Sequence, residues 1–248
     1  MQKLTAVIIT YNEARNIKRC IESLEGIADE IVVVDSFSTD ATPSICKGLG
    51  VQFYQREWKG YSFQKNYGNG LASNDCILSI DADEALSEEL KKAILKTKEN
   101  DRQHNYSFNR LTNYCGKWIR HSGWYPDTKI RIFNRTADDW QGTVHEKLTV
   151  NPKTVKKLKG DLLHYSYYQV SEHVAQTDRF ATLSAKELQE SGVRPSWLKI
   201  IFSPVAKFLK FYVLNLGFLD GKAGWKIATV SAHGTYLKYV RHYKASRD

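Results

Sequence analysis

Short apolar runs alternate with segments of helical periodicity through the first third of this 248-residue chain, and that alternation restricts the fold more than any other feature. The runs are rich in Val, Ile and Leu, as strands are, and they cover residues 4–10, 31–34, 51–54 and 76–80. Helices are predicted between them at residues 17–24, 42–48 and 62–71. Strands connected by helices form a parallel sheet, and continuous apolar runs fit strands buried on both faces. The pattern predicts an α/β fold, a Rossmann-like, mostly parallel sheet flanked by helices.

The pattern changes after residue 100, where alternating strands are expected at 106–111, 128–134 and 146–150, followed by a helix at 171–191. We place a catalytic domain at residues 1–192 and a basic helical tail at residues 193–248. Four widely spaced cysteines without a paired motif favour a reducing, cytosolic compartment.

Polar and acidic residues follow three of the predicted strands, as Thr10–Glu13, Asp35–Ser36 and Asp81–Glu84. The carboxyl ends of parallel strands meet at one edge of a sheet, where open α/β sheets bind their ligands. At strand spacing Asp81 and Asp83 point the same way, and Mg²⁺ or Mn²⁺ held by one or two carboxylates and by substrate phosphates fits such a pair. A solvated turn before a helix at 87–98 explains the same acids without a metal. The sequence lacks the Gly-rich motifs that signal dinucleotide binding and P-loop hydrolysis.

The last fifth of the chain carries most of the net charge of +9, with seven Lys and two Arg against two Asp from residue 195 onward. Apolar residues from Leu198 to Tyr212 recur at three- and four-residue spacing, which predicts an amphipathic helix. Residues 200–219 are long enough to span a bilayer, but two central lysines and Pro204 argue against it. We expect a helical appendage that lies on an anionic membrane surface. Packing on the catalytic domain and self-association into an oligomer are the alternatives.

Three motifs, in this order, resemble those of the family 2 inverting glycosyltransferases, which have the GT-A fold. They are Val7–Glu13, Val33–Asp40 and Asp81–Glu84, and the resemblance extends over residues 1–190. Two later segments, Gly142–Glu146 and Gly217–Lys222, are similar to the branch that includes lipopolysaccharide-core β-glucosyltransferases. The resemblance implies a metal-dependent enzyme, using Mg or Mn, that moves glucose or another hexose from a UDP-sugar to a glycan or glycolipid acceptor such as lipopolysaccharide core. Together with the basic tail, it implies a peripheral protein on the cytoplasmic face of the inner membrane.

Carried over to this sequence, the family's donor site falls on the ends of the same strands. The resemblance implies that Thr10, Tyr11 and Glu13 line the nucleotide pocket. It further implies that Asp35 hydrogen-bonds the uracil ring and that Lys65 reaches a phosphate. Asp81 would face the ribose or the metal, Asp83 would bind the divalent ion, and His164 is the candidate for a further metal ligand. A solvated Lys65 and a satisfied histidine at a strand end are the open alternatives.

The family's catalytic base is usually the Asp of a Glu-Asp pair, where this chain has His145 and Glu146. Glu146 matches the family's base by position and is the preferred candidate. A neutral His145 is also able to take a proton near pH 7. For either residue, the alternative role is a contact with the acceptor sugar. Trp124, Tyr125 and Asp127 are candidates for acceptor binding, although buried packing explains a Trp equally well. The implied mechanism is a single displacement that inverts the configuration, so that an α-linked nucleotide sugar gives a β-glycoside.

Two other functions fit part of the sequence. A sugar nucleotidyltransferase also uses carboxylates and Mg²⁺, but a Gly-rich, basic loop is expected after its first strand, where this chain has Tyr11–Glu13. A non-catalytic nucleic-acid-binding protein would use the basic, aromatic tail. That function leaves the aligned carboxylates unexplained, because an acidic edge repels a phosphate backbone. We therefore expect no nucleic-acid partner.

Overall fold

The computed structural model describes residues 3–99, 105–142 and 146–245, which fall into two compact units. The first, which we call the sheet unit, comprises Met1–Arg110 and Asp127–Tyr165 within those limits. The second, the helical unit, comprises Leu111–Pro126 and Ser166–Asp248. This division differs from the expected boundary between residues 192 and 193. Helix α5 (Val170–Glu190) packs on the C-terminal helix α7 (Lys222–Ala245) and therefore belongs to the same unit as that helix.

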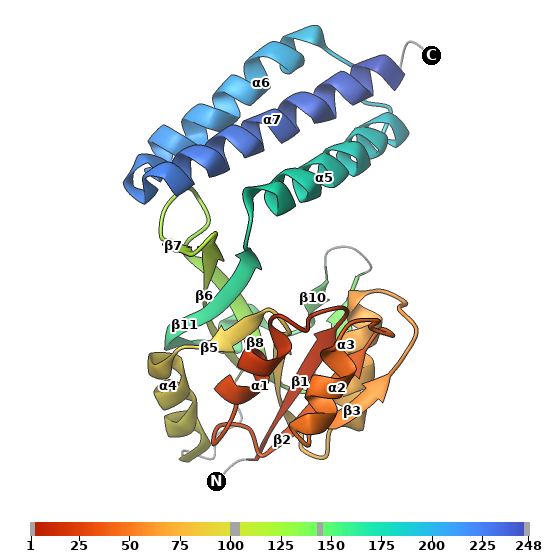
Figure 1. Cartoon of the computed structure of the whole chain (residues 1–248), viewed down its shortest axis with the longest axis vertical. Helices are drawn as coiled ribbons and strands as arrows, with labels where there is room; N and C mark the ends of the chain where they lie inside the picture. The colour runs from red at the N-terminus through yellow and green to blue at the C-terminus, as the bar shows by residue number, and fades with distance from the viewer. Residues whose placement is uncertain (1–2, 100–104, 143–145, 246–248) are drawn as a thin grey trace. The chain divides into compact units, whose positions relative to one another are not determined.

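Four parallel strands form the first half of the sheet (Figure 1). The strand β1 (Leu4–Thr10) pairs with β2 (Glu30–Asp35) on one side and with β4 (Cys76–Asp81) on the other. On the outer side β2 pairs with β3 (Gln52–Gln55), again in parallel. The four strands predicted from the apolar runs are therefore confirmed, and β1 has the predicted bounds.

Helices cover both faces of this half of the sheet. On the face that carries Ala6 and Ile8, the core includes residues of α1 (Ile17–Ser23), α2 (Thr42–Gly48) and α4 (Glu88–Glu99). The helix α3 (Tyr61–Leu71) packs on the opposite face. Its Gly68 lies so close to β1 that a Cβ atom there would be 2.4 Å from Cγ1 of Val7. Alternate β1 residues thus enter two separate cores, as expected of a strand buried on both faces.

Further strands continue the sheet in antiparallel pairs. The strand β8 (Asp127–Asn134) pairs with β4 and with β6 (Asn105–Tyr114), and β11 (Val155–Tyr167) pairs with β5 (Glu84–Leu86). Across the described residues the strand order is β3-β2-β1-β4-β8-β6-β11-β5, with β7 (Lys117–Ile119) paired to β6. The strand expected at 146–150 is reduced to β10 (Lys147–Leu148), paired with β9 (Trp140–Gln141). The basic segment after it, beyond a short 3-10 turn, is the beginning of β11.

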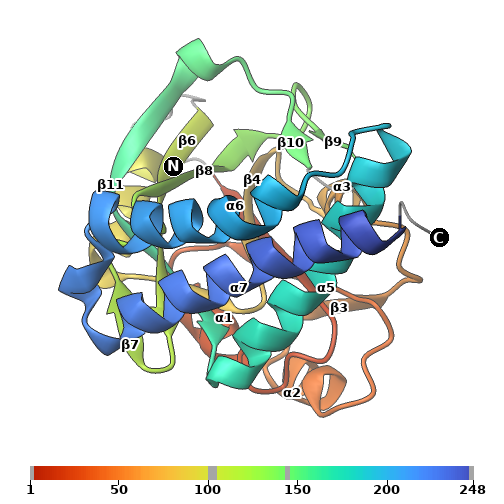
Figure 2. The same cartoon turned by 90° about the horizontal axis from the view of Figure 1, so that it is seen from above.

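In the helical unit α7 packs against both α5 and α6 (Trp197–Leu209) (Figure 2). Aromatic rings join α7 to α6 and to the turn that follows it, because Trp225 meets Phe208 of α6 and Tyr212 of that turn edge to face, with ring centroids 5.1 and 5.3 Å away. A glycine allows the close approach of α5, since a Cβ atom on Gly234 would be 2.3 Å from Cγ2 of Thr177. These contacts make the three helices one packed layer.

The predicted tail helix is interrupted. It ends as an α-helix at Leu209 and continues as a π-helical turn, Lys210–Leu214, before Leu216 takes a left-handed φ of 54°. The 3-10 turn that follows ends at Asp220, whose buried carboxylate accepts hydrogen bonds from the backbone of Arg120 and His121. No helix in the described ranges is both long and apolar enough to cross a membrane.

Candidate active site

The carboxyl ends of β1, β2 and β4 lie level with one another in the sheet unit. In the parallel register Thr10 is opposite Asp35, and Ile9 is opposite Asp81. The residues that follow these strands therefore meet at one edge, as predicted. A pocket of about 810 Å³ opens there, lined by Ile9, Thr10, Tyr11, Glu13, Ser36, Trp58, Tyr61, Asp81, Ala82, Asp83 and His164.

Three residues from the end of β1 give the pocket a polar wall. Oγ1 of Thr10 is buried and has no hydrogen-bond partner among the described residues, so it is a polar atom that a ligand could satisfy. Tyr11 is 58% exposed and presents its ring to the solvent side. Burial raises the pKa of Glu13, and a hydrogen bond from Asn16 (2.8 Å) opposes that shift. The predicted nucleotide-pocket residues Thr10, Tyr11 and Glu13 thus share one wall.

The loop after β2 is hydrogen-bonded to the turn after β1. Asn12 has a left-handed φ of 54°, and its backbone N–H donates to Oγ of Ser38 (2.7 Å). Asp35 is fully buried beneath this loop, where it accepts bonds from the N–H and the hydroxyl of Ser38 and from Gln55 (3.0 Å). Asp35 therefore does not line the pocket. With three of its roughly four acceptor positions in use, the Asp35 carboxylate has about one left for a nucleotide base.

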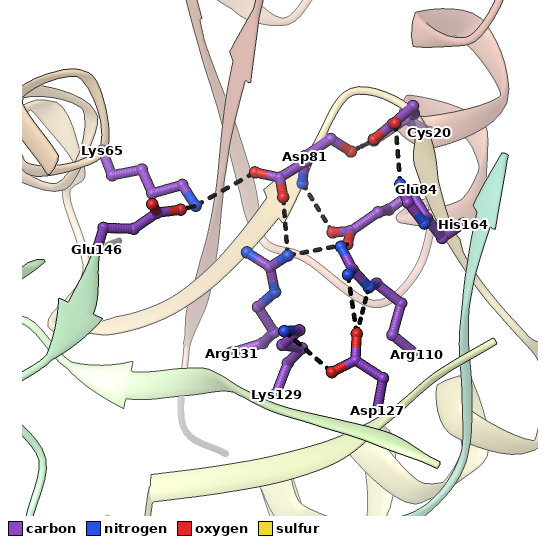
Figure 3. Close-up of polar contacts among 11 residues, drawn as sticks. Cys20, Lys65, Asp81, Glu84, Arg110, Asp127, Lys129, Arg131, Glu146 and His164 are labelled. Atoms are coloured by element: carbon purple, nitrogen blue, oxygen red, sulfur yellow. Dashed lines mark hydrogen bonds and ion pairs between the residues drawn. The ribbon is translucent and has the colours of Figure 1, made fainter. Parts of the chain in front are cut away.

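A buried arginine holds the two inner carboxylates of the Asp81–Glu84 segment (Figure 3). Arg131 of β8 places Nη2 2.8 Å from both Oδ2 of Asp81 and Oε1 of Glu84. Burial alone would raise the pKa of Asp81, but the charges of Arg131 and Lys65 outweigh it and hold that pKa well below its usual range. Burial raises the pKa of Glu84, against the attraction of the same arginine. The two protein cations therefore favour the anionic form of Asp81.

Lys65 links this network to Glu146. Its side chain is 2% exposed, and Nζ lies 3.1 Å from Oε1 of Glu146 and 3.4 Å from Oδ1 of Asp81. The ammonium also sits 4.5 Å from the centre of the Trp140 ring, a cation–π contact. Asn66, the next residue of α3, exchanges two hydrogen bonds with the backbone of Trp140 (2.8 and 2.9 Å). The helix α3 thus contacts both Glu146, through Lys65, and the backbone of Trp140, through Asn66.

Asp83 and His164 form a second, more open pair in the pocket. Oδ2 of Asp83 lies 3.1 Å from Nε2 of His164, and the two side chains are 27% and 14% exposed. No group of three or more His, Cys, Asp and Glu within the described ranges could hold a metal ion. One carboxylate and one imidazole nevertheless fit a divalent ion whose other ligands are diphosphate oxygens and water. Asp81, the other predicted ligand, already pairs with Arg131 and Lys65.

The predicted acceptor residues are divided between the units. In the helical unit Trp124 is half-buried and packs edge to face on Tyr114, with ring centroids 5.7 Å apart. Tyr125 lies beneath the guanidinium of Arg120, at 5.6 Å. In the sheet unit Asp127 pairs with Arg110 (2.8 Å) and Lys129 (3.0 Å), whose charges lower its pKa against the effect of burial. His145, the alternative base, lies outside the described residues.

The sequence interpretation missed Arg131, Trp58 and Tyr61. The first is an arginine between two isoleucines in the apolar half of β8, and buried carboxylates call for a buried cation. That signal was present but could not be assigned before the partner strand was known. Trp58 and Tyr61 pack edge to face (4.8 Å) on the pocket wall. Gly60 lies between them and is the residue before α3. Its positive φ of 113° is a backbone conformation that favours glycine.

The sheet unit is an α/β fold with a carboxylate-lined pocket at the ends of its parallel strands. The family model Glycosyl transferase family 2 matches residues 5–150, more than half of the chain. The chain therefore belongs to glycosyl transferase family 2 and is a glycosyltransferase. The resemblance and the GT-A-like α/β fold expected from it are confirmed.

Similar proteins cover nearly all of the chain. An uncharacterized glycosyltransferase of Rickettsia bellii is 31% identical over 253 residues, which span 97% of this chain and 86% of the relative. The lipopolysaccharide core biosynthesis glycosyltransferase LpsC of Rhizobium meliloti is 30% identical over 260 residues, which span 99% of this chain and 96% of LpsC. Among solved structures, TarS of S. aureus (residues 1–349) has a TM-score of 0.49 at 14% identity, covering 99% of this chain and 91% of that one.

Proposed function

We propose that the protein transfers a hexose from a UDP-sugar to a glycolipid acceptor of the lipopolysaccharide-core type, by a metal-assisted single displacement with inversion. The observation that carries this proposal is the pair of carboxylates on opposite sides of Lys65, next to the open Asp83–His164 pair. Membership of family 2 supports the reaction class. The name of the relative LpsC supports an acceptor in the lipopolysaccharide core.

The donor would bind in the pocket at the ends of β1, β2 and β4. Thr10 and Tyr11 provide polar and aromatic contacts for the nucleoside, and the free Oγ1 of Thr10 is a ready hydrogen-bond partner. Asp83 and His164 would hold Mg²⁺ or Mn²⁺ together with the donor diphosphate. When bound, the ion supplies positive charge that stabilises the departing diphosphate. Lys65 adds a fixed cation behind the pocket-lining Asp81, at 3.4 Å.

Glu146 is the base that we favour. Its carboxylate would take the proton of the acceptor hydroxyl as that oxygen attacks the anomeric carbon. Lys65 fixes one oxygen of the carboxylate at 3.1 Å, which restricts its rotation and leaves the other oxygen available to the acceptor. Attack from the face opposite the nucleotide makes a β-glycoside from an α-linked donor. Trp124, Tyr125 and Asp127 stay candidates for the acceptor side.

We further propose that the helical unit rests on an anionic membrane surface, the cytoplasmic face of the inner membrane. The helix α6 has no buried residue. Leu198, Phe202, Val205 and Leu209, at three- and four-residue spacing, are 46%, 62%, 55% and 48% exposed. Lysines at positions 199 and 210 are exposed on the same segment. An apolar stripe bordered by cations is the arrangement of a helix that lies in a bilayer interface.

A panel of nucleotide sugars, each with Mg²⁺ or Mn²⁺, tests the donor and the metal together. We expect a UDP-hexose to raise the melting temperature and to release UDP when a lipopolysaccharide-core acceptor is present. The variant Asp83→Ala removes a metal ligand and no core volume, so it should keep the fold and lose at least about 10²-fold in turnover. Normal turnover by this variant would refute the metal assignment. Turnover of other nucleotide sugars but no UDP-sugar would refute the donor assignment.

A further inference from the structure

A second hollow of the sheet unit shares no lining residue with the donor pocket. It measures about 900 Å³ and lies between α4 and the beginning of β11, the elements so labelled in Figure 1. Five lysines line it, two from the helix and three from the strand, and within the described residues Glu89 is its one acidic lining residue. We call it the lysine groove, after Lys92, Lys96, Lys156, Lys157 and Lys159, all of which are exposed.

The two walls of the lysine groove are fixed to each other at one end. Gly160 of β11 has a φ of 91° and lies so close to α4 that a Cβ atom there would be 2.3 Å from the backbone nitrogen of Leu90. Ser87 and Asp161 add a reciprocal pair of hydrogen bonds, at 3.1 and 3.0 Å. The lysines therefore project from two rigid elements rather than from a loop, so a ligand would find the backbone already in place.

The charge of the lysine groove is concentrated, not spread evenly over α4. Two other lysines of this helix pair with acids, Lys91 with Glu88 (2.8 Å) and Lys98 with Asp29 (2.7 Å). Lys92 and Lys96 line the groove together with the three strand lysines. Like charges four residues apart on a helix repel each other, as do like charges gathered in one hollow. A bound anion would relieve that repulsion, which favours binding of ligands with several negative charges.

We propose that the lysine groove binds a compact ligand that carries clustered phosphate groups. Lysine ammonium groups form strong charge-assisted hydrogen bonds with phosphate oxygens. The volume suits a head group or a small molecule. The aromatic residue of the groove, Tyr106, is 8% exposed and offers no open face on which a base could stack, which disfavours nucleic acid. The phosphates could belong to a membrane lipid or to a soluble phosphorylated saccharide.

Calorimetry with inositol hexakisphosphate, a compact soluble polyphosphate, tests the site directly. The groove variant is Lys156→Gln, Lys157→Gln and Lys159→Gln combined. The matched control removes the same charge from other exposed helices, as Lys18→Gln, Lys47→Gln and Lys186→Gln combined. We expect saturable binding by the unmodified protein, binding at least about tenfold weaker by the groove variant, and a change below about twofold in the control. Equal melting temperatures would establish that both variants fold.

Vesicles distinguish the two sources of phosphate. Both variants and the unmodified protein are sedimented with phosphatidylcholine vesicles that contain phosphatidic acid. Weaker sedimentation of the groove variant than of the control would identify a lipid head group as the ligand. Equal sedimentation, combined with the loss in calorimetry, would exclude a lipid head group and assign the groove to a soluble phosphorylated ligand. The proposal is overturned if inositol hexakisphosphate does not saturate the protein, or if the control loses as much affinity as the groove variant. Neither result depends on glycosyl transfer.

Discussion

Lys65 occupies a position where its removal should affect chemistry and stability together. It is buried between Glu146 and Asp81, and without its charge the two carboxylates would lie in the pocket with less compensation. We expect Lys65→Met to lower kcat by about 10²-fold, because the base loses its orientation. We also expect a lower free energy of unfolding, by about 1.5–3 kcal/mol, from the lost charge-assisted contacts. Steady-state kinetics and urea unfolding measure the two effects.

A double-mutant cycle shows whether Lys65 acts through Glu146. If it does, adding Lys65→Met to Glu146→Gln should cost little beyond the more severe single change, since the two residues act as a unit. Full additivity of the two losses in kcat would contradict that relation. Lys47→Met, on the exposed end of α2, is the control for removing a lysine from the sheet unit.

His173 makes the stability of the helical unit depend on pH. Its ring is 5% exposed, contacts the hydroxyl of Tyr114 through Nδ1 (3.1 Å), and has a pKa lowered by burial to about 4. The unfolded chain binds this proton at a pKa near 6.5. The contribution of His173 is therefore fully present above pH 6.5 and is lost progressively as the pH falls towards 4. The melting temperature should fall between pH 7.5 and pH 5.

The comparison variant for this effect is His173→Gln, which cannot gain the proton. Its melting temperature should fall less over the same pH interval, even if it is lower at pH 7.5. His233→Gln removes an exposed histidine of α7 and should keep the full pH dependence. An identical pH profile for His173→Gln and the unmodified protein would show that His173 is not the responsible group.

At the scale of elements, the contact of α3 with β1 determines where Lys65 lies. Gly68→Ala would place a methyl group 2.4 Å from Cγ1 of Val7 and 3.1 Å from Cγ2 of Val34. We expect a loss of about 1–3 kcal/mol in the free energy of unfolding, because the helix must move away from the strand. Gly70→Ala, two residues further along the same helix, meets no atom within 4 Å. It should be neutral or stabilising by up to about 1 kcal/mol. Equal effects of the two changes in urea unfolding would contradict this packing argument.

The elements that the sequence predicts well are those whose pattern is local. The apolar run of β1 and the helical pattern of α2 are each contained in seven residues, and both have the predicted bounds. The length of β11 could not be predicted, because its basic first part has no apolar pattern and β11 joins the sheet by pairing with β6, a strand distant in sequence. The ion pair between Asp81 and Arg131 could not be predicted from the sequence either. The two residues are 50 positions apart, and the antiparallel pairing of β4 with β8 brings them together.

The site shows the same division between local and distant signals. Five predicted donor-site residues lie at or just after the ends of parallel strands, so the parallel topology brings them to the pocket; they are Thr10, Tyr11, Glu13, Asp81 and Asp83. His164 lies within β11 and reaches the pocket through the antiparallel pairing of β11 with β5. The burial of Asp35 depends on Ser38 and Gln55, which hold its carboxylate from a loop and a neighbouring strand. The position of the predicted base Glu146 next to Lys65 depends on α3, which also holds Trp140 of β9 through Asn66.

At the scale of the whole molecule, the two units differ in surface chemistry. The sheet unit has an acidic edge with fixed cations and a groove of lysines. The helical unit exposes large apolar side chains along α6 and the turns that follow, where Leu214 is 75% and Phe218 is 47% exposed. A water-soluble surface seldom keeps a contiguous apolar patch without a partner. In the membrane proposal, the bilayer is the partner of this apolar patch. The phosphate ligand of the lysine groove is a separate partner, bound by the sheet unit.

Point changes in α6 test the membrane proposal without removing any element of the fold. Ile201 and Phe202 are 53% and 62% exposed, so Ile201→Ser combined with Phe202→Ser should leave the melting temperature nearly unchanged. Removing this much apolar area from a bilayer interface costs about 2–4 kcal/mol, and we expect a loss of at least about tenfold in binding to phosphatidylglycerol vesicles, measured by co-sedimentation. Phe37→Ser combined with Phe63→Ser removes similarly exposed side chains from the sheet unit and should bind vesicles as before. Equal vesicle binding by the α6 variant and the unmodified protein would exclude α6 as the membrane face. A shift of the α6 variant from oligomer to monomer in light scattering would instead assign the apolar stripe to contact with a second copy of the chain.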